Sequence, residues 1–246
     1  MKDYQAPGDL LKDKVILVTG AGAGIGQAAA RAYAAHDATV VLLGRTVRKL
    51  EETYDASVEA GHPEPAIYPM NLENASWDDY LQLAQIIEEQ MGRLDGILNN
   101  AGFLGSLTPL EHYDLELWSR VMQINLHAPY LLTRACLPLL KKADRASVIF
   151  TSSDVGRSGE AYWGAYAISN AGVENLMQIF ADEMETNTNI RFNTIDPGSV
   201  RTHMRTRAFP GEDPNTVPAP EEIMPLYLYA MGDDSHEISG QSLSAQ

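Results

Sequence analysis

Three side chains with chemically useful groups lie close together in the second half of the chain: the hydroxyl of Ser153, the phenol of Tyr166 and the amide of Asn170. Tyr166 and Asn170 are four positions apart, so on a helix they share a face. Ser153 follows an apolar run that is typical of a strand. A hydroxyl at a strand end and a phenol on the next helix could bind a substrate oxygen and exchange a proton with it. Asn170 could contribute only hydrogen bonds, because amides do not ionise.

The elements that must position these groups alternate between short apolar runs and amphipathic stretches. The apolar runs predict strands at 14–19, 39–43, 66–70, 95–99, 147–151, 190–195 and 241–245. The amphipathic stretches predict helices at 26–35, 46–60, 76–90, 114–141 and 163–185. Strands this apolar, separated by helices, indicate a parallel sheet covered on both faces. Because such crossovers are right-handed, the sequence predicts an α/β fold: a single doubly wound parallel sheet, or Rossmann fold, with helices on both faces.

Length and composition indicate one domain over residues 1–246. The chain is 45% hydrophobic, which is enough to fill one core, and it has no internal repeat or linker. The only extended irregular stretch is 209–220, where four prolines and a glycine oppose regular structure. This stretch could be a lid over a site or a plain surface connection.

The net charge of −15 argues against nucleic acid or an anionic membrane as a partner, because both favour basic surfaces. No apolar run approaches the roughly 18 residues that a transmembrane helix needs, and the first residues have no signal-peptide core. Cys136 is the only cysteine, so the chain fits a reducing compartment, and its apolar setting predicts a buried thiol. We expect a cytoplasmic protein without a metal site.

A glycine-rich segment, Thr19-Gly-Ala-Gly-Ala-Gly-Ile-Gly26, lies between the first predicted strand and the first predicted helix. Glycines there allow a tight turn and let the backbone approach a pyrophosphate at the helix N-terminus. We therefore predict a dinucleotide site, with contacts from Gly20, Gly22, Ala23, Gly24, Ile25 and Gly26.

The ends of the second and third predicted strands bear on which dinucleotide binds. Gly44 leaves space after the second strand, and Arg45 offers a planar cation suited to a 2′-phosphate, so NADP(H) is favoured over NAD(H). An exposed arginine at a strand end is the alternative. After the third strand, Asn71 and Leu72 could border the adenine, although Asn71 could equally be a turn residue.

These motifs together resemble the short-chain dehydrogenase/reductase family. The resemblance covers nearly the whole chain and rests on Thr19–Gly26, Asn99-Asn-Ala-Gly102, Asn125, Ser153, Tyr166 and the segment 193–202. Segment 225–235 is similar to a bacterial branch of YciK-type oxidoreductases, which are related to 3-oxoacyl-acyl-carrier-protein reductases.

The resemblance implies a role for each matched residue. Ser153 would hydrogen-bond the substrate oxygen, Tyr166 would exchange a proton with it, and Asn125 would kink the long helix and hold a water. The cofactor would contact Asn99, Ala101 and Gly102 beside the adenine ribose, and Pro197, Gly198, Val200 and Thr202 on the nicotinamide side. The alternatives are a strand-capping Asn99, a turn hydroxyl at Ser153 and a packed ring at Tyr166.

Three positions depart from the family pattern. Asn170 stands where the family has a lysine, whose ammonium would favour the phenolate of Tyr166. Losing a positioned acid or base costs about 10² to 10⁴ in rate, so catalysis should be impaired. Asn71 replaces an aspartate beside the adenine, and Ala23 replaces a basic residue found in many NADP-preferring relatives.

The resulting hypothesis is an NADP(H)-dependent oxidoreductase that interconverts a small carbonyl and an alcohol. The alternatives are a catalytically silent NADP(H)-binding sensor or oligomer partner, and an active enzyme whose lysine was replaced in this chain. Arg201 and Arg205 could receive an anionic substrate or be solvated loop residues, and Tyr162, Trp163 and Phe209 could form apolar walls. The resemblance also implies a homodimer or homotetramer through helices 114–141 and 163–185.

Overall fold

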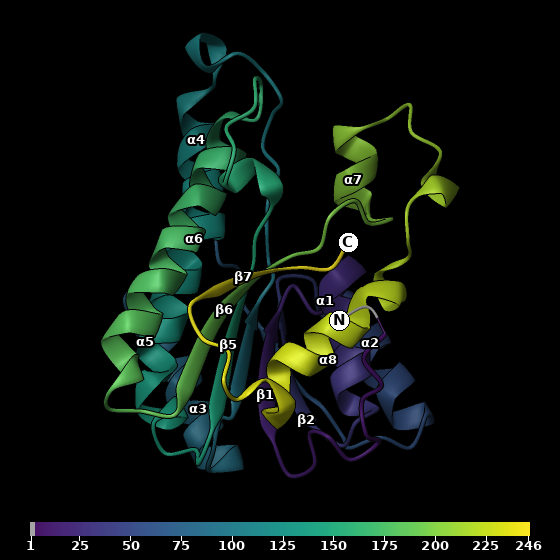
Figure 1. The fold of residues 1–246 in the computed structure, drawn as a ribbon, viewed down its shortest axis with the longest axis vertical. Helices are drawn as coiled ribbons and strands as arrows, with labels where there is room; N and C mark the ends of the chain where they lie inside the picture. The colour runs from purple at the N-terminus through teal and green to yellow at the C-terminus, as the bar shows by residue number, and fades with distance from the viewer. Residues whose placement is uncertain (1–2) are drawn as a thin grey trace.

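The computed structural model describes residues 3–246, which form one seven-stranded parallel sheet with the strand order β3-β2-β1-β4-β5-β6-β7. The strands are β1 (Val15–Thr19), β2 (Thr39–Gly44), β3 (Ala66–Pro69), β4 (Gly96–Asn99), β5 (Ala146–Thr151), β6 (Ile190–Asp196) and β7 (Gln241–Ser244). Helices cover both faces (Figure 1). The predicted doubly wound α/β fold is confirmed.

Two helical layers enclose the sheet. One face is covered by α1 (Gly24–Ala34), α2 (Val47–Glu59) and α8 (Met224–Met231), and the other by α3 (Trp77–Met91), α4 (Leu115–Met122), α5 (Ala128–Leu140) and α6 (Gly164–Glu185), as Figure 1 shows. Each layer has its own apolar core, because alternate residues of the buried strands point to opposite faces. Leu17 and Phe192, for example, face the α3, α5 and α6 layer, whereas Ile16 and Ile195 face the other.

The strand order reverses between β1 and β4, where the chain leaves β3 and returns on the other side of β1. The loops that follow β1 and β4 turn to opposite faces of the sheet. In such folds ligands bind in the crevice between these loops, outside the carboxyl ends of the strands. The glycine-rich segment, Arg45, Asn71, Ser153 and the segment 197–202 each follow a strand at this edge.

The long helix predicted at 114–141 is interrupted. A π-helical turn at Gln123–His127 separates α4 from α5, and Asn125 lies within it. Such turns insert one residue into a helix and change its direction, which is the kink that the resemblance implies at Asn125.

Two helices in the last quarter of the chain were not predicted. The helix α7 (His203–Ala208) is too short for a periodic pattern to be recognised, and α8 is apolar on nearly every side because it is buried. The predicted irregular stretch contains the short 3₁₀ turns Pro214–Thr216 and Pro220–Ile223. Other 3₁₀ turns lie at Leu110–His112, Asp154–Gly156 and Asp233–Ser235.

The predictions for Cys136 and for membrane spans can be checked directly. Cys136 is fully buried, and burial raises the pKa of its thiol to about 12, so it is a core residue. Among residues 3–246, no helix combines the length and the apolar character needed to cross a membrane.

Candidate active site

The glycine-rich segment forms the loop between β1 and α1, where the backbone is partly exposed because its residues have small side chains or none. Gly20 and Gly24 have φ values of 69° and 56°, which favour glycine. A methyl group on Gly26 would lie 2.4 Å from the carbonyl oxygen of Gly20 and 2.6 Å from Nδ2 of Asn100. Ala23 is the N-cap of α1 and offers no side-chain acceptor, so the first amides of that helix lack a side-chain cap. This cradle fits a pyrophosphate, which would meet only backbone N–H groups and the helix N-terminus.

The buried hydroxyl of Thr19 ties this segment to the end of β4. Its Oγ1 accepts hydrogen bonds from the backbone amides of Asn100 and Ala101, each at 2.9 Å. Asn100 Nδ2 also donates to the carbonyl of Thr19 at 3.3 Å. By contrast, Asn99 points into the α5 side of the core and donates to Oγ1 of Thr133 at 3.2 Å. The side chain at the glycine loop is therefore that of Asn100, which the sequence prediction did not single out.

The ends of β2 and β3 lie beside each other. The amide of Met70 donates to the carbonyl of Gly44 at 3.0 Å, and Arg45 is exposed just beyond. Exposed Asn71 accepts a hydrogen bond from the amide of Glu73 at 3.2 Å, which is an ordinary turn contact. Leu72 is buried. This region presents Arg45 as a cation at the edge of the sheet.

Tyr166 and Asn170 lie in the first two turns of α6, as the spacing predicts. Tyr166 is half-buried and Asn170 is buried, and Asn170 Nδ2 donates to the main-chain carbonyl of Tyr166 at 2.9 Å. The pKa of the Tyr166 phenol is raised to about 12, mainly by burial and in part by the charges of Asp196 and Asp154. Hydrogen bonding from Asn170 and Ser153 opposes this rise in pKa only in part. The phenol is therefore held in its neutral, proton-donating form.

Ser153 follows β5 and stands near the same phenol, but its proton is engaged elsewhere. Its Oγ donates to Oδ1 of Asp154 at 3.0 Å, and the same carboxylate oxygen accepts the amide of Val155 at 2.8 Å. An ionised carboxylate only accepts hydrogen bonds. A substrate oxygen can therefore receive the Ser153 proton only if the hydroxyl rotates away from Asp154.

Asn125 is separate from this group. Its Oδ1 accepts the amide of Phe103 at 2.8 Å, and its Nδ2 donates to the carbonyl of Phe103 at 3.0 Å and to Oγ of Ser169 at 3.1 Å. The side chain thus fastens the segment after β4 to the π-helical turn and to α6. Its water-holding role stays a prediction from the resemblance.

The segment after β6 returns to the glycine loop. Gly198 has a φ of 68°, and its amide donates to Oδ1 of Asp196 at 2.9 Å. Val200 is buried, and Thr202 caps α7 by accepting the amide of Arg205 at 3.2 Å. A methyl group on Gly24 would lie 3.3 Å from Cγ2 of Thr202. The segment predicted to hold the pyrophosphate and the segment predicted to lie on the nicotinamide side therefore meet.

A charge network that joins two buried carboxylates to the exposed Arg157 was absent from the sequence prediction. Arg157 donates through Nη2 to Asp196 at 2.5 Å, and through Nη1 to Glu174 at 3.2 Å and to Oγ of Ser242 at 2.7 Å. Glu174, which lies one turn after Asn170, also accepts the hydroxyl of Thr194 at 2.9 Å. The network joins α6, β6 and β7 to the loop that carries Ser153. Its members are too far apart in the sequence for a local pattern to reveal them.

The family pattern for short chain dehydrogenases matches residues 14–213. The chain belongs to the short chain dehydrogenase family. It is 47% identical over 243 residues to the uncharacterized oxidoreductase YciK of Escherichia coli, with 99% of this chain and 96% of YciK covered.

Solved structures of short chain dehydrogenases are similar along the full chain. One from Pseudomonas syringae is 54% identical, with a TM-score of 0.96 and full coverage of both chains. One from Shigella flexneri, complexed with NADP, is 47% identical, with a TM-score of 0.95 over 98% of this chain and 100% of that one. One from Escherichia coli, complexed with NADPH, is 48% identical, with a TM-score of 0.95 over 98% of this chain and 99% of that one. The family resemblance, including its YciK-type branch, is confirmed.

We predict that Gly26→Ala weakens NADPH binding by about 10- to 100-fold, because overpacking costs about 1 to 3 kcal/mol. The added methyl group would displace the Gly20 carbonyl or the Asn100 amide and so open the cradle. Isothermal titration calorimetry measures the affinity. The control is Gly8→Ala, where an added methyl group meets nothing within 4 Å. Unchanged affinity in Gly26→Ala would show that the cradle does not hold the cofactor.

Proposed function

We propose that this short chain dehydrogenase is an NADP(H)-dependent oxidoreductase that interconverts a small carbonyl compound and an alcohol. The observation that carries the proposal is the convergence of Ser153 and Tyr166 at the carboxyl edge of the sheet, beside the segment 197–202 that meets the glycine loop. A bound nicotinamide would supply or accept the hydride at this edge. The chain supplies the proton and orients the substrate oxygen.

The proton chemistry favours carbonyl reduction. A neutral phenol with a pKa of about 12 can protonate the alkoxide that forms when a carbonyl is reduced, because alkoxides are stronger bases than phenolates. The reverse reaction needs the phenolate as a base, and at neutral pH this form is scarce. Ser153 would hold the substrate oxygen beside the phenol once its hydroxyl turns from Asp154.

Asn170 is the reason to expect a slow enzyme. In the family the residue at this position is a lysine, and Asn170 offers the phenol only hydrogen bonding from a neutral amide. The carboxylates of Asp154 and Asp196 both act to raise the pKa of Tyr166. This electrostatic setting also supports the second candidate function, a silent NADP(H)-binding sensor or oligomer partner.

The preference for NADP(H) over NAD(H) is supported by the similar structures that hold NADP and NADPH and by the exposed guanidinium of Arg45 at the end of β2. Gly44, the residue before Arg45, has no side chain that could block a phosphate. The helix α2 begins at Val47, and its Lys49 packs against Gly22 of the glycine loop. A 2′-phosphate here would meet positive charge.

We expect Arg45→Ala to weaken NADPH binding by about tenfold and to leave NADH binding unchanged, since a charge-assisted hydrogen bond to phosphate contributes about 1.5 to 3 kcal/mol. Titration calorimetry with both dinucleotides on the same protein provides an internal control, because only NADPH carries the 2′-phosphate. An equal loss for both dinucleotides would instead indicate damage to the fold of the loop. Unchanged affinity for both dinucleotides would remove Arg45 from the proposed site.

We expect Asn170→Lys to raise alcohol oxidation at pH 8 by at least about tenfold, because a neighbouring ammonium lowers the pKa of Tyr166 and each pKa unit is a factor of ten in phenolate. In the unchanged chain, oxidation should rise steadily with pH up to the alkaline limit of folding. In the variant the plateau should begin at lower pH, and carbonyl reduction should fall there as the neutral phenol is lost. Initial rates with NADPH or NADP⁺ across pH 6 to about 10 measure both profiles.

The matched control is Asn187→Lys, which adds the same charge at an exposed position just beyond the end of α6. It should leave both profiles unchanged. Turnover only in Asn170→Lys, with tight NADPH binding in both proteins, would favour the silent alternative. Equal profiles in all three proteins would mean that Tyr166 does not carry the proton, and failure to bind either dinucleotide would refute both candidate functions.

The homodimer or homotetramer and the cytoplasmic location stay predictions. Exposed apolar side chains on α5 and α6, namely Tyr130, Ile168 and Ile179, support association through these helices. Light scattering should give twice or four times the chain mass of 27.0 kDa. A monomer mass would contradict this prediction.

A further inference from the structure

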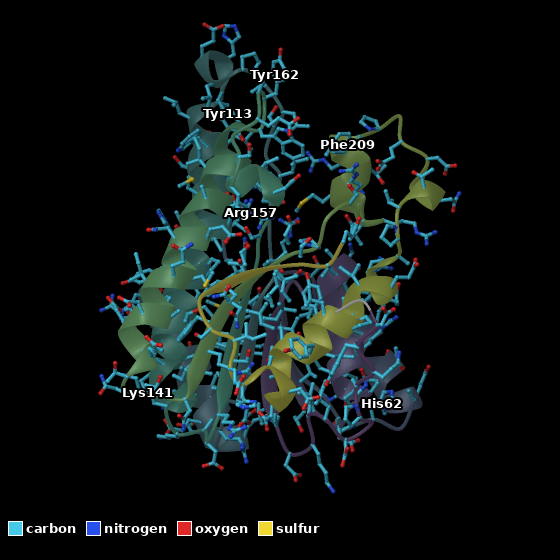
Figure 2. All side chains as sticks on the ribbon, in the orientation of Figure 1. His62, Tyr113, Lys141, Arg157, Tyr162 and Phe209 are labelled. Carbon is cyan, nitrogen blue, oxygen red and sulfur yellow. The ribbon has the colours of Figure 1, made fainter. Side chains whose placement is uncertain are left out.

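Aromatic rings form a row beside the phenol of Tyr166. The ring of Trp163, the N-cap of α6, lies with its centroid 5.7 Å from that of Tyr166 and 6.0 Å from that of Phe209. Phe209 is the C-cap of α7, and Figure 2 shows it on the α7 side, across from Tyr162, which precedes the start of α6. An apolar wall therefore runs from the proton-donating group to the segment after β6.

The arginine closest to this wall is already paired. Arg205 donates through Nε and Nη2 to the two carboxylate oxygens of Glu212, at 2.7 and 2.6 Å. Its guanidinium also lies 3.7 Å from the centre of the Phe209 ring. Hydrogen bonding from Arg205 lowers the pKa of the Glu212 carboxyl, so the pair stays charged at neutral pH. Arg205 is therefore not free to bind an anionic substrate, as the basic-patch hypothesis required. Exposed Arg201 donates a hydrogen bond to Oδ1 of Asn215 at 3.4 Å.

Charge near the phenol also opposes an anionic substrate. The acidic side chains whose charges reach Tyr166 are Asp154 and Asp196, and Asn170 places a neutral amide where the family has a cation. The single positive charge of Arg157 pairs with two carboxylates, those of Asp196 and Glu174, so the net charge of this cluster is negative. The net charge of −15 adds repulsion at long range.

We propose that the substrate is an uncharged carbonyl compound with a flat apolar group, and that this group stacks on Trp163 between Tyr166 and Phe209. The inference rests on the proposed function and names the substrate class of the same site. Trp163 and Phe209 contact the flat group, and the pair of Arg205 and Glu212 acts as a positioning pair that holds the Phe209 ring.

Two ketones that differ only in charge test the substrate class: the methyl ester of para-acetylbenzoic acid and para-acetylbenzoate itself. Calorimetry on the NADP⁺-loaded protein gives their affinities, and NADPH oxidation gives kcat/KM. We expect the ester to be favoured at least about tenfold in both, because an uncompensated charge next to like charges is disfavoured. Trp163→Ala and Phe209→Ala should each weaken ester binding by about tenfold with NADPH affinity unchanged, and Trp163→Phe should restore most of it.

Glu212→Gln tests the positioning pair. The change frees the Arg205 charge, so preference for the ester should fall by about fivefold or more as para-acetylbenzoate gains a cation to pair with. The matched control is Glu221→Gln, an exposed glutamate in a nearby 3₁₀ turn, which should leave the preference unchanged.

The outcomes separate the two proposals. Equal or tighter binding of para-acetylbenzoate, an unchanged ester affinity in Trp163→Ala, or binding of neither ketone to the NADP⁺-loaded protein would each overturn the substrate class. If other carbonyls are still reduced, the proposed function stands. Failure to bind NADPH would overturn the proposed function itself.

Discussion

The structure depends most on one buried hydroxyl, that of Thr19, at the point where the strand order reverses. It accepts the backbone amides that follow β4 and lies directly before the glycine loop that follows β1. The central strands and both loops of the cofactor cradle therefore have a common anchor. Gly26 approaches the Gly20 carbonyl and the Asn100 amide so closely that no side chain fits. The surface of this loop is thus defined by backbone groups.

The positive charge of Arg157 is already paired with two carboxylates, so it cannot stabilise a phenolate at Tyr166. Arg157 bridges Glu174 of α6 and Asp196 of β6, two buried carboxylates that would be costly if left unpaired. This pairing holds the turn at Gly198, and it leaves the phenol of Tyr166 without an ammonium beside it. The same electrostatic setting favours a proton donor over a base and an uncharged substrate over an anion. The proposed reaction direction and the proposed substrate class therefore have a common cause.

The segment after β6 links the glycine-rich loop to the aromatic residues around Trp163. Thr202 lies against Gly24 and caps α7, and α7 ends at Phe209 beside Trp163. The pair of Arg205 and Glu212 closes the turn beyond the helix. A short helix with so few buried residues is held mainly by these polar contacts, so this segment can adjust to a ligand more readily than the sheet can.

Local patterns in the sequence were sufficient to predict the seven strands, the glycine loop and the helical face shared by Tyr166 and Asn170. Apolar runs, tight turns and the helical period depend on neighbouring residues, so the chain itself determines them. Only the tertiary structure distinguished Asn100 from Asn99 at the loop, assembled Arg157 with residues from three other elements, and paired Arg205 with Glu212. Helix α8 was missed because burial on all sides removes the amphipathic signal. Contacts between segments distant in the sequence depend on how the layers pack, and no local pattern records that.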